Sequence, residues 1–582
     1  MRADTRAEEA WARERRALAA VARGDAPADR YVHGGLVLNV YTGELYPAHV
    51  AIRGERVAYV GPRDDMVGPR TGVIDARGRT LVPGYIEPHA HPWNLVTPAA
   101  LARHVLPLGT TAVVGDNLSC YQLCRAPGFA RAMAALSRLP LRYYWMVRIE
   151  AQAQVPGEAA MFPLPALRRL LDAPEVVAVG ETTRWPRVEA GEMSLLRRAA
   201  LAALRGKRHE GHTAGAKPER LAAIAAAGVT SDHEPITADE ARERMRQGIA
   251  VMLRQSSLRP DLAELVEPFA KSGSLGRLML TTDGSTPAFI AEHGFVDNLL
   301  RVAMRQGIPP IEAYRMATLN PATYFGRDAD LGGIAPGRYA DINLLHDLEE
   351  PRPAAVIARG RLVAEGGALR VAVPEPDWAR IFTPAATRFT RRWRLAPEDL
   401  ALPSGPIPVI RLVSAVITTA EVRPMRADDL HLALVDRRGG WIATTAIAGL
   451  ATDLDGLAAT LSTDCEIVAA GRSRAAVARA VNRLLDRRGG VVVVDGDRIA
   501  FDLPLPVGGL MSRRPLPDVA RAERELRALL VARGYPWHDP LFTLLFLTAD
   551  FLPSVRMSSR GVWDVKRARV LRPSQPLAAG PR

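Results

Sequence analysis

Two histidines flank a single residue in the stretch PGYIEPHAH, residues 83–91. The apolar residues that lead up to them predict a short β-strand, with His89 and His91 at its carboxyl end. Side chains at positions i and i+2 of a strand point to the same side, so both imidazoles can reach one metal ion. A single pair of this kind is equally compatible with chance or with two structural histidines.

Four more side chains with metal-binding chemistry follow predicted strands further along the chain. Glu181 ends VVAVGE, His212 lies in HEGHTAGA, His233 lies in GVTSDHE, and Asp283 lies in RLMLTTDG. Together with the first pair they form a sufficient set of ligands for two divalent cations, and a carboxylate such as Glu181 can bridge both ions with its two oxygens. Imidazole and carboxylate ligands suit Zn, Mn or Fe(II).

The HEGH run at residues 209–212 is similar to the HExxH signature of zinc proteases but is one residue too short. That signature places its histidines at positions i and i+4, on one face of a helix. His209 is therefore interpreted as a surface residue or as a neighbour of the ligands.

The elements that must position these residues are strands and helices in alternation. From about residue 83 to 330, short apolar runs such as TTAVVGD alternate with Ala-, Leu- and Arg-rich helical segments such as PERLAAIAAAG. Repeated strand-then-helix units predict a parallel sheet with helices outside it, and roughly 250 residues is the size of one (β/α)8 barrel. Such barrels carry their active sites at the carboxyl ends of the strands, where all six candidate ligands are expected.

The segments on either side of the barrel have a different pattern. Residues 31–82 and 331–370 predict a small β-sandwich beside the barrel, formed by both flanks of the chain. Residues 371–405 are Pro-rich and connective, and residues 406–582 predict a C-terminal α+β domain that packs near the barrel mouth or at a subunit contact. Residues 1–30 predict an exposed amphipathic helical extension. The expected fold class is therefore α/β, with a TIM-like barrel at its centre.

Composition limits the class of protein. The 582 residues are 48% hydrophobic, and no apolar run reaches the ~18 residues of a membrane helix. Three cysteines, Cys120, Cys124 and Cys465, form no disulfide framework and fit a reducing cytoplasm. The net charge of +13 would permit nucleic-acid binding, but arginine is spread through every segment and no basic tract is interleaved with aromatics. A small-molecule substrate, no nucleic-acid or membrane partner, and a homo-oligomer are expected.

These segments resemble the bacterial adenine deaminase family of the amidohydrolase superfamily. PGYIEPHAH resembles that family's Pro-Gly-aromatic-Ile-Asp-x-His-x-His strand, and GHTAGA with TSDHE resembles its Gly-His-x-x-Gly and Ser/Thr-Asp-His-Glu segments. GGVVVVDGDRIAFDLPLPVGGLMS and DPLFTLLFL resemble its C-terminal domain. The likeness covers about residues 30 to 565.

The resemblance implies a binuclear site without a carboxylated lysine. His89 and His91 would hold one ion with Asp283, Glu181 would bridge, and the remaining two histidines would hold the other ion. The resemblance also implies Mn or Fe(II), with Zn as a third candidate, and the hydrolysis of adenine to hypoxanthine and ammonia.

One of these ligands and two further residues have candidate roles in the reaction itself. Asp283, a carboxylate beside the metal and the water, is the expected proton shuttle. Glu234 directly follows His233 and is expected to protonate a ring nitrogen, to orient His233, or only to accept a hydrogen bond nearby. Arg254, in VMLRQSS, either contacts the substrate or pairs with a carboxylate of the site.

Departures from the family pattern gather around the expected pocket. PWNLVTP lacks a glutamate, GDNLSCYQLC keeps Asp116 but lacks a His and a Glu, TTDG has Gly284 in place of a second acid, and LSTDCEIV replaces a His-Asp-Ser-His run. Asp116 is expected at the substrate, and Trp93 offers either a stacking face or core packing. The alternative function is therefore a deaminase or amidohydrolase acting on another small amino-heterocycle or cyclic amide. A scaffold or nucleic-acid-binding protein is disfavoured by the intact ligand set.

Overall fold

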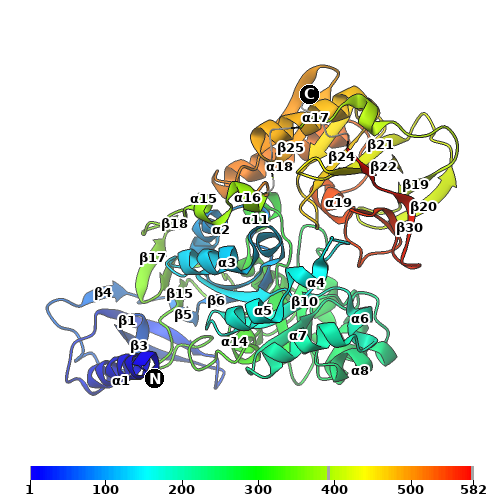
Figure 1. Cartoon of the computed structure of the whole chain (residues 1–582). Coiled ribbons are helices and arrows are strands. Elements are labelled where there is room, and N and C mark those ends of the chain that lie inside the picture. Colours follow the sequence, from blue (N-terminus) through cyan, green and yellow to red (C-terminus); the bar gives the residue numbers. More distant parts are fainter. Residues whose placement is uncertain (1, 388, 390–392, 578–582) are drawn as a thin grey trace.

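The computed structural model describes residues 2–387, 389 and 393–577. Residues 1 and 578–582, which end the predicted N-terminal extension and C-terminal domain, lie outside the described residues. Figure 1 shows a central barrel with a sheet on one side, near the N-terminus, and a β-rich domain on the other, near the C-terminus. No helix in the described part of the chain is long and apolar enough to cross a membrane.

The central barrel has eight strands within the described residues, and every neighbouring pair is parallel. A parallel bridge between Ala90 and Asp283 brings its first and last strands together, so the barrel nearly closes. The strands are β6 (Tyr85–Ala90), β8 (Thr110–Asp116), β9 (Arg142–Val147), β10 (Val176–Thr182), β11 (Arg208–Gly211), β12 (Ser231–Asp232), β13 (Ala250–Arg254) and β14 (Leu278–Thr281). The predicted TIM-like barrel is confirmed.

Strands β8, β10 and β13 of the barrel are buried along their whole length. Strands covered on both faces are near-continuous apolar runs, which is why TTAVVGD and AVMLR do not alternate with polar residues. The helices outside them are amphipathic: α5 buries Leu167 and Leu170 and exposes Arg168 and Arg169. The longer barrel helices are α2 (Pro98–Val105), α3 (Leu118–Leu136), α5 (Leu164–Leu171), α7 (Met193–Ala203), α8 (Pro218–Ala226), α9 (Ala238–Arg246), α11 (Pro287–His293), α12 (Val296–Arg305) and α13 (Pro310–Ala317).

Both flanks of the barrel segment enter one nine-stranded sheet in the described chain. Strand β5 pairs antiparallel with β15, which joins residues before the barrel to residues after it. Helix α1 (Arg2–Arg23) covers this sheet with Leu18 and Val21. The strands are β1 (Arg30–Asn39), β2 (Glu44–Arg53), β3 (Arg56–Gly61), β4 (Gly72–Asp75), β5 (Thr80–Pro83), β15 (Ile342–Leu345), β16 (Ala355–Ala358), β17 (Arg361–Glu365) and β18 (Ala368–Leu369).

The C-terminal domain is built on a second nine-stranded sheet, with α17 (Arg474–Arg487) packed on it. Helix α17 buries alanines, valines and leucines against the sheet, and its arginines are exposed or partly exposed. The strands of this sheet are β19 (Ile407–Leu412), β20 (Thr418–Arg423), β21 (Leu430–Val435), β22 (Trp441–Ala448), β23 (Gly456–Ala459), β24 (Ile467–Gly471), β25 (Gly490–Asp495), β26 (Arg498–Pro504) and β31 (Gln575–Pro576). A smaller sheet contains β28 (Val555–Ser558), β29 (Gly561–Asp564) and β30 (Arg569–Pro573).

The C-terminal domain is attached to the mouth of the barrel. Strand β27 (Met511–Ser512) pairs in parallel with β7 (Leu95–Val96), which follows the HxH strand. Nε of Arg184, just after β10, donates a hydrogen bond of 2.8 Å to Asp550. Helices α18 (Leu516–Val531) and α19 (Pro540–Phe546) lie between the sheet of the domain and the barrel. Of the two placements left open by the sequence, the barrel mouth is therefore the one that the structure shows.

Candidate metal centre and active site

Every barrel strand places a polar side chain at or just beyond its carboxyl end. Because the strands are parallel, these ends meet at one mouth. In strand order the side chains are His89 and His91 (β6), Asp116 (β8), Arg148 (β9), Glu181 (β10), His212 (β11), His233 and Glu234 (β12), Arg254 (β13) and Asp283 (β14). The structure thus brings the six ligands predicted from the sequence together in one place.

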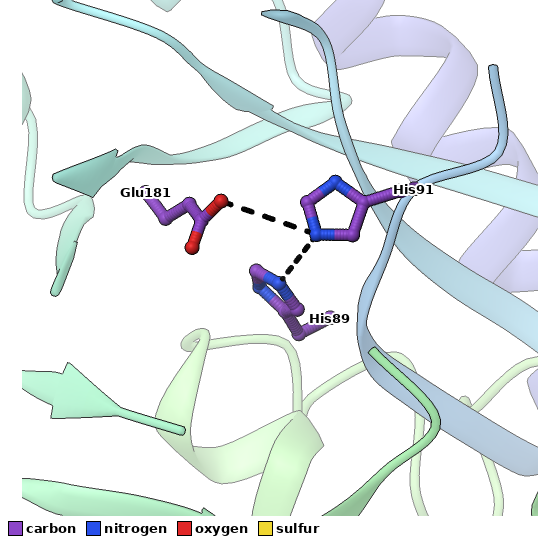
Figure 2. A group of neighbouring side chains, drawn as sticks. All are labelled: His89, His91 and Glu181. Atoms are coloured by element: carbon purple, nitrogen blue, oxygen red, sulfur yellow. Dashed lines mark hydrogen bonds and ion pairs between the residues drawn. The ribbon is translucent and has the colours of Figure 1, made fainter. Parts of the chain in front are cut away.

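Three of these residues, His89, His91 and Asp283, form what we call the first triad. Nε2 of His89 lies 3.2 Å from Nε2 of His91 and 3.3 Å from Oδ1 of Asp283. Nε2 of His91 and Oδ1 of Asp283 are 3.1 Å apart. Figure 2 shows Nε2 of His91 directed both at His89 and at Glu181, whose Oε1 lies 3.9 Å away.

The second triad consists of Glu181, His212 and His233. Oε2 of Glu181 lies 2.7 Å from Nδ1 of His212 and 3.2 Å from Nε2 of His233, and these two nitrogens are 3.1 Å apart. Ligand atoms that share one cation at about 2.1 Å lie ~3 Å from each other. Both triads have this spacing, and their donors are of the kind that Mn, Fe(II) and Zn accept. The residues present therefore fit a divalent metal centre.

The electrostatics of the triads favours positive charge. Burial would lower the pKa of His91, but hydrogen bonds with two carboxylates raise it to about 9. Burial and the nearby His89 also oppose protonation of His233, yet two carboxylates raise its pKa to about 10. Burial would raise the pKa of Asp283, but hydrogen bonds with two imidazoles hold it well below its usual range. The carboxylates that stabilise protonated histidines here would also attract metal cations, which compete with protons for the same nitrogens.

Two buried carboxylates orient the histidines from behind. Oδ2 of Asp116 lies 3.2 Å from Nδ1 of His91. Oε1 of Glu210 lies 2.8 Å from Nδ1 of His89 and 3.3 Å from Nδ1 of His233. The rings of these two histidines stack, with centroids 4.0 Å apart. A carboxylate on the far nitrogen fixes the tautomer of a ligating imidazole and leaves Nε2 free for the metal. Glu210 lies within ion-pair distance of one histidine of each triad.

Arg148 links the carboxylates of the site. Its Nη2 donates a hydrogen bond of 2.5 Å to Oε1 of Glu181, and its Nε donates one of 2.6 Å to Oδ1 of Asp116. Gln152 donates a second hydrogen bond of 2.8 Å to the same oxygen of Glu181. Burial opposes the charge of Arg148, but the two carboxylates raise its pKa above the ordinary value, so it stays charged.

Arg254 and Glu234 form a buried ion pair at the edge of the second triad. Oε1 of Glu234 is 3.6 Å from Nδ1 of His212, and Nη1 of Arg254 is 3.7 Å from Oδ2 of Asp283. Burial would raise the pKa of Glu234, but Arg254 and two imidazoles lower it. The structure thus pairs Arg254 with site carboxylates, as one of the two sequence alternatives has it. Both residues also line the pocket above the triads.

Trp93 is buried in the core and does not line the pocket, as the predicted substrate contact would require. Its side chain is 2% exposed and stacks on Trp145, with ring centroids 5.3 Å apart. Its indole N–H donates to the backbone carbonyl of Asp116 at 2.7 Å. Trp93 therefore packs in the core, and its hydrogen bond joins it to the end of β8.

The sequence prediction missed three residues that contact the triads, namely Arg148, Gln152 and Glu210. Glu210 precedes His212 by two residues on β11, the same alternation that pointed to His89 and His91, so this spacing could have indicated it. Arg148 directly follows the apolar strand β9, and strand-end position was the available signal. His209 is buried against Thr182 Oγ1 at 2.8 Å and lies outside both triads.

The C-terminal domain forms an aromatic roof over the triads. We give the name aromatic roof to Phe542, Phe546 and Phe551, which line the pocket, with the ring of Phe546 in contact with each of the other two. The ring of Phe551 meets the ring of His212 edge-on, with centroids 4.9 Å apart. A Cβ at Gly284 would lie 2.9 Å from Cζ of Phe542, so the glycine that replaces an acid of the family pattern allows this ring to approach.

A parallel eight-stranded barrel with histidine and carboxylate triads at its strand ends defines a metal-dependent hydrolase of the amidohydrolase type. Residues 80–363 match the amidohydrolase family, and residues 411–569 match the adenine deaminase C-terminal domain. The chain belongs to the adenine deaminase family, whose members hydrolyse C–N bonds other than peptide bonds.

Relatives of this family match almost the whole chain. An adenine deaminase of Rubrobacter xylanophilus is 35% identical over 94% of this chain and 95% of its own length. An adenine deaminase of Cenarchaeum symbiosum is 34% identical over 97% of this chain and 95% of its own length. Among solved structures, a β-aspartyl dipeptidase of Fervidobacterium islandicum AW-1 has a TM-score of 0.47 and 18% identity, covering 59% of this chain and 98% of its own.

Proposed function

We propose that this protein is a metal-dependent hydrolytic deaminase that converts adenine and water to hypoxanthine and ammonia. The observation that carries the proposal is the pair of ligand triads at the floor of one pocket, in a chain whose relatives are named adenine deaminases. A homo-oligomer in the cytoplasm, with no nucleic-acid partner, belongs to the same proposal.

Each triad is proposed to hold one divalent cation, with Mn or Fe(II) preferred and Zn as a third candidate. Divalent cations lower the pKa of water towards neutrality, which is the chemistry they would supply here. The chain's part is to fix the donor atoms, and it does so through the two buried carboxylates behind the imidazoles, Asp116 and Glu210.

Asp283 is proposed to move the protons. It is a carboxylate that lines the pocket beside both imidazoles of the first triad. In the reaction, the oxygen of water forms a bond to C6 of adenine and the C6–N bond to the amino group breaks. Asp283 would take a proton from water and deliver it to that nitrogen, which leaves as ammonia.

Glu234 is proposed to accept a hydrogen bond from the purine ring and not to protonate that ring. Its ion pair with Arg254 helps to lower its pKa, so at neutral pH it is a hydrogen-bond acceptor. A ring N–H of a purine base is a donor of the matching kind. The aromatic roof offers flat apolar faces to the same planar base, and Gln152 offers a polar contact at the wall of the pocket.

A second candidate function is supported by one observation. Gly284 stands where the family pattern has an acid, and the ring of Phe542 approaches that place. A pocket that exchanges an acid for an aromatic ring loses a hydrogen-bonding partner for the base, and such losses change specificity strongly. The candidate is hydrolysis of another small amino-heterocycle or cyclic amide by the same triads.

Ammonia release by the Mn-loaded protein tests the proposal. We expect turnover of adenine to hypoxanthine by the wild type and at least a thousandfold loss in Asp283→Asn, which keeps the shape of the side chain but cannot carry the proton. Release from another amino-heterocycle or a cyclic amide, without release from adenine, would select the second candidate. Absence of turnover with every substrate of both classes would reject the hydrolase.

A further inference from the structure

One ring of the aromatic roof is carried by a loop of turns and bends. We call residues 547–554, between α19 and β28, the roof loop. Phe551 lies within it and lines the pocket, where its ring meets the ring of His212 with centroids 4.9 Å apart. A loop holds a side chain in one place only where contacts outside the loop fix its backbone. The position of this ring over the second triad therefore depends on what anchors the roof loop.

Asp550, the residue before Phe551, anchors the roof loop to the barrel. Its Oδ1 accepts a hydrogen bond of 2.8 Å from Nε of Arg184, and its Oδ2 accepts one of 2.5 Å from Nε2 of Gln154. Its backbone N–H donates to the carbonyl oxygen of Gln152 at 3.0 Å. The side chain of Asp550 is 3% exposed, and charge-assisted hydrogen bonds shielded from water are among the stronger ones. All three partners belong to the barrel, so this residue joins the two domains.

Arg184 is itself fixed by the barrel. Its Nη1 donates a hydrogen bond of 2.8 Å to Oε1 of Glu158, and its Nη2 donates one of 2.5 Å to the carbonyl oxygen of Ala153. Its backbone N–H donates to Oε1 of the buried Glu150 at 2.8 Å. The guanidinium therefore cannot follow the loop if the loop moves, and its bond to Asp550 fixes the loop to a rigid point.

Gln152 connects this anchor with the metal centre. Its backbone carbonyl accepts the hydrogen bond of Asp550, and its side chain donates one of 2.8 Å to Oε1 of Glu181. One residue thus links the carboxylate of the second triad to the residue that precedes Phe551. The roof loop is therefore placed relative to the ligands themselves and not only to the barrel as a whole.

Arg556 holds the roof loop together from inside the C-terminal domain. Its side chain is 1% exposed, and it donates hydrogen bonds of 3.2 Å to the carbonyl oxygens of Phe546 and Leu552, on either side of Phe551. Loss of the Asp550 anchor should therefore displace the loop as a unit and not unfold it.

We infer that Arg184 and Asp550 are positioning residues for the substrate: their ion pair fixes the place of Phe551 over the second triad, and with it the affinity of the pocket for a planar ring. The inference rests on the proposed function, because a planar base is the substrate proposed there, and it concerns binding and not the chemical step. Aromatic rings attract a flat partner only at contact distance, so a displaced roof loop loses this contribution. The triads come from barrel strands and keep their donor atoms.

Asp550→Asn in the full chain tests the inference. Asparagine keeps the shape of the side chain but not its charge, and Arg184 keeps its bond to Glu158, so the variant is expected to fold. For adenine hydrolysis by the Mn-loaded protein we expect KM to rise about tenfold, the order that one aromatic contact supplies, with kcat nearly unchanged. Hydrogen exchange of the backbone amides in the roof loop should become faster, while the affinity for Mn(II) stays the same.

A second variant and a matched control accompany it. Arg184→Met should raise KM in the same way, and the double variant should add little, because both changes remove one ion pair. Asp172→Asn is the control: it removes a bond of the same 2.8 Å length, from Nε of Arg205, at a site outside the pocket, and should change neither KM nor exchange in the roof loop. Circular dichroism melts check that each variant is folded.

Two results would overturn the inference. Faster exchange with an unchanged KM would mean that the ion pair only supports the fold, and unchanged exchange in the roof loop would mean that it does not hold the loop. A wild type that binds Mn(II) but does not act on adenine defeats the proposed function instead. The KM comparison then passes to the heterocycle or cyclic amide that is hydrolysed, and the exchange comparison, which needs no substrate, stands as it is.

Discussion

Oε1 of Glu210 lies 2.8 Å from Nδ1 of His89, and both side chains are completely buried. The same oxygen lies 3.3 Å from Nδ1 of His233, so one carboxylate orients a ligand in each triad. The rings of these two histidines also stack on each other, with centroids 4.0 Å apart.

The relationship predicts that Glu210→Gln weakens metal binding at both triads. A glutamine oxygen is a weaker acceptor, and its amide would point N–H groups at imidazole N–H groups. Loss of such outer partners costs about 10- to 100-fold in metal affinity or activity. Mn(II) titration and kcat/KM measure the effect, and Glu219→Gln serves as the control. Loss at one triad alone would contradict the shared role.

Removing the partner of Glu234 should change the pH dependence. Arg254 lowers the pKa of the buried Glu234 carboxyl, so Arg254→Met should raise that pKa. The acidic limb of the profile of kcat/KM against pH should then move to higher pH. Arg259→Met is the control, because Arg259 lines the same pocket but pairs with Asp261 at 2.8 Å. Equal profiles for both variants would count against the predicted effect.

The approach of the aromatic roof depends on Gly284. A Cβ there would meet Cζ of Phe542 at 2.9 Å, closer than side chains normally pack. We expect Gly284→Ala to lower kcat/KM about tenfold and Phe542→Ala to restore part of that loss in the double variant, since adjacent residues couple. The double-mutant cycle measures the coupling, and strictly additive effects would show that the two residues act separately.

Trp93 is expected to act on stability and not on substrate binding. Trp93→Phe keeps an aromatic ring against Trp145 but removes the hydrogen bond to the carbonyl of Asp116, which costs about 1 kcal/mol. The larger Trp93→Ala change should cost ~3–5 kcal/mol in free energy of unfolding. Thermal melts measure the effect on stability, and KM measures any effect on substrate binding. If Trp93→Phe raises KM and leaves the melting temperature unchanged, Trp93 contacts the substrate after all.

Removal of the metal should make stability depend on pH in the alkaline range. In the metal-free chain, and against the effect of burial, Asp116 and Asp283 raise the pKa of His91 to about 9, and Glu181 and Glu210 raise the pKa of His233 to about 10, above the ordinary value of 6.5. Groups with raised folded-state pKa values contribute stability that is complete below pH 6.5 and is lost as pH rises through 9 to 10. The melting temperature of chelated protein should fall over that range, whereas Mn-loaded protein should change less. Parallel curves for both forms would contradict the prediction.

The sequence by itself was enough to predict the barrel and to place the candidate ligands at one of its ends. Alternation of apolar strands with amphipathic helices is a local signal, and position at a strand's carboxyl end follows from it. His89, His91 and Glu181 could therefore be assigned to one mouth before any distance was known. Their meeting there needs only that the strands are parallel.

The tertiary structure decided what surrounds the ligands. Contacts such as Arg148 with Glu181, or Phe551 with His212, join segments far apart in the chain, and no local pattern reports which partners they find. The same limit explains Trp93, because stacking at a pocket and packing in a core demand the same residue type. Strand ends are set by short-range periodicity, whereas the environment of each polar atom is set by how distant segments pack, and only the folded chain determines that.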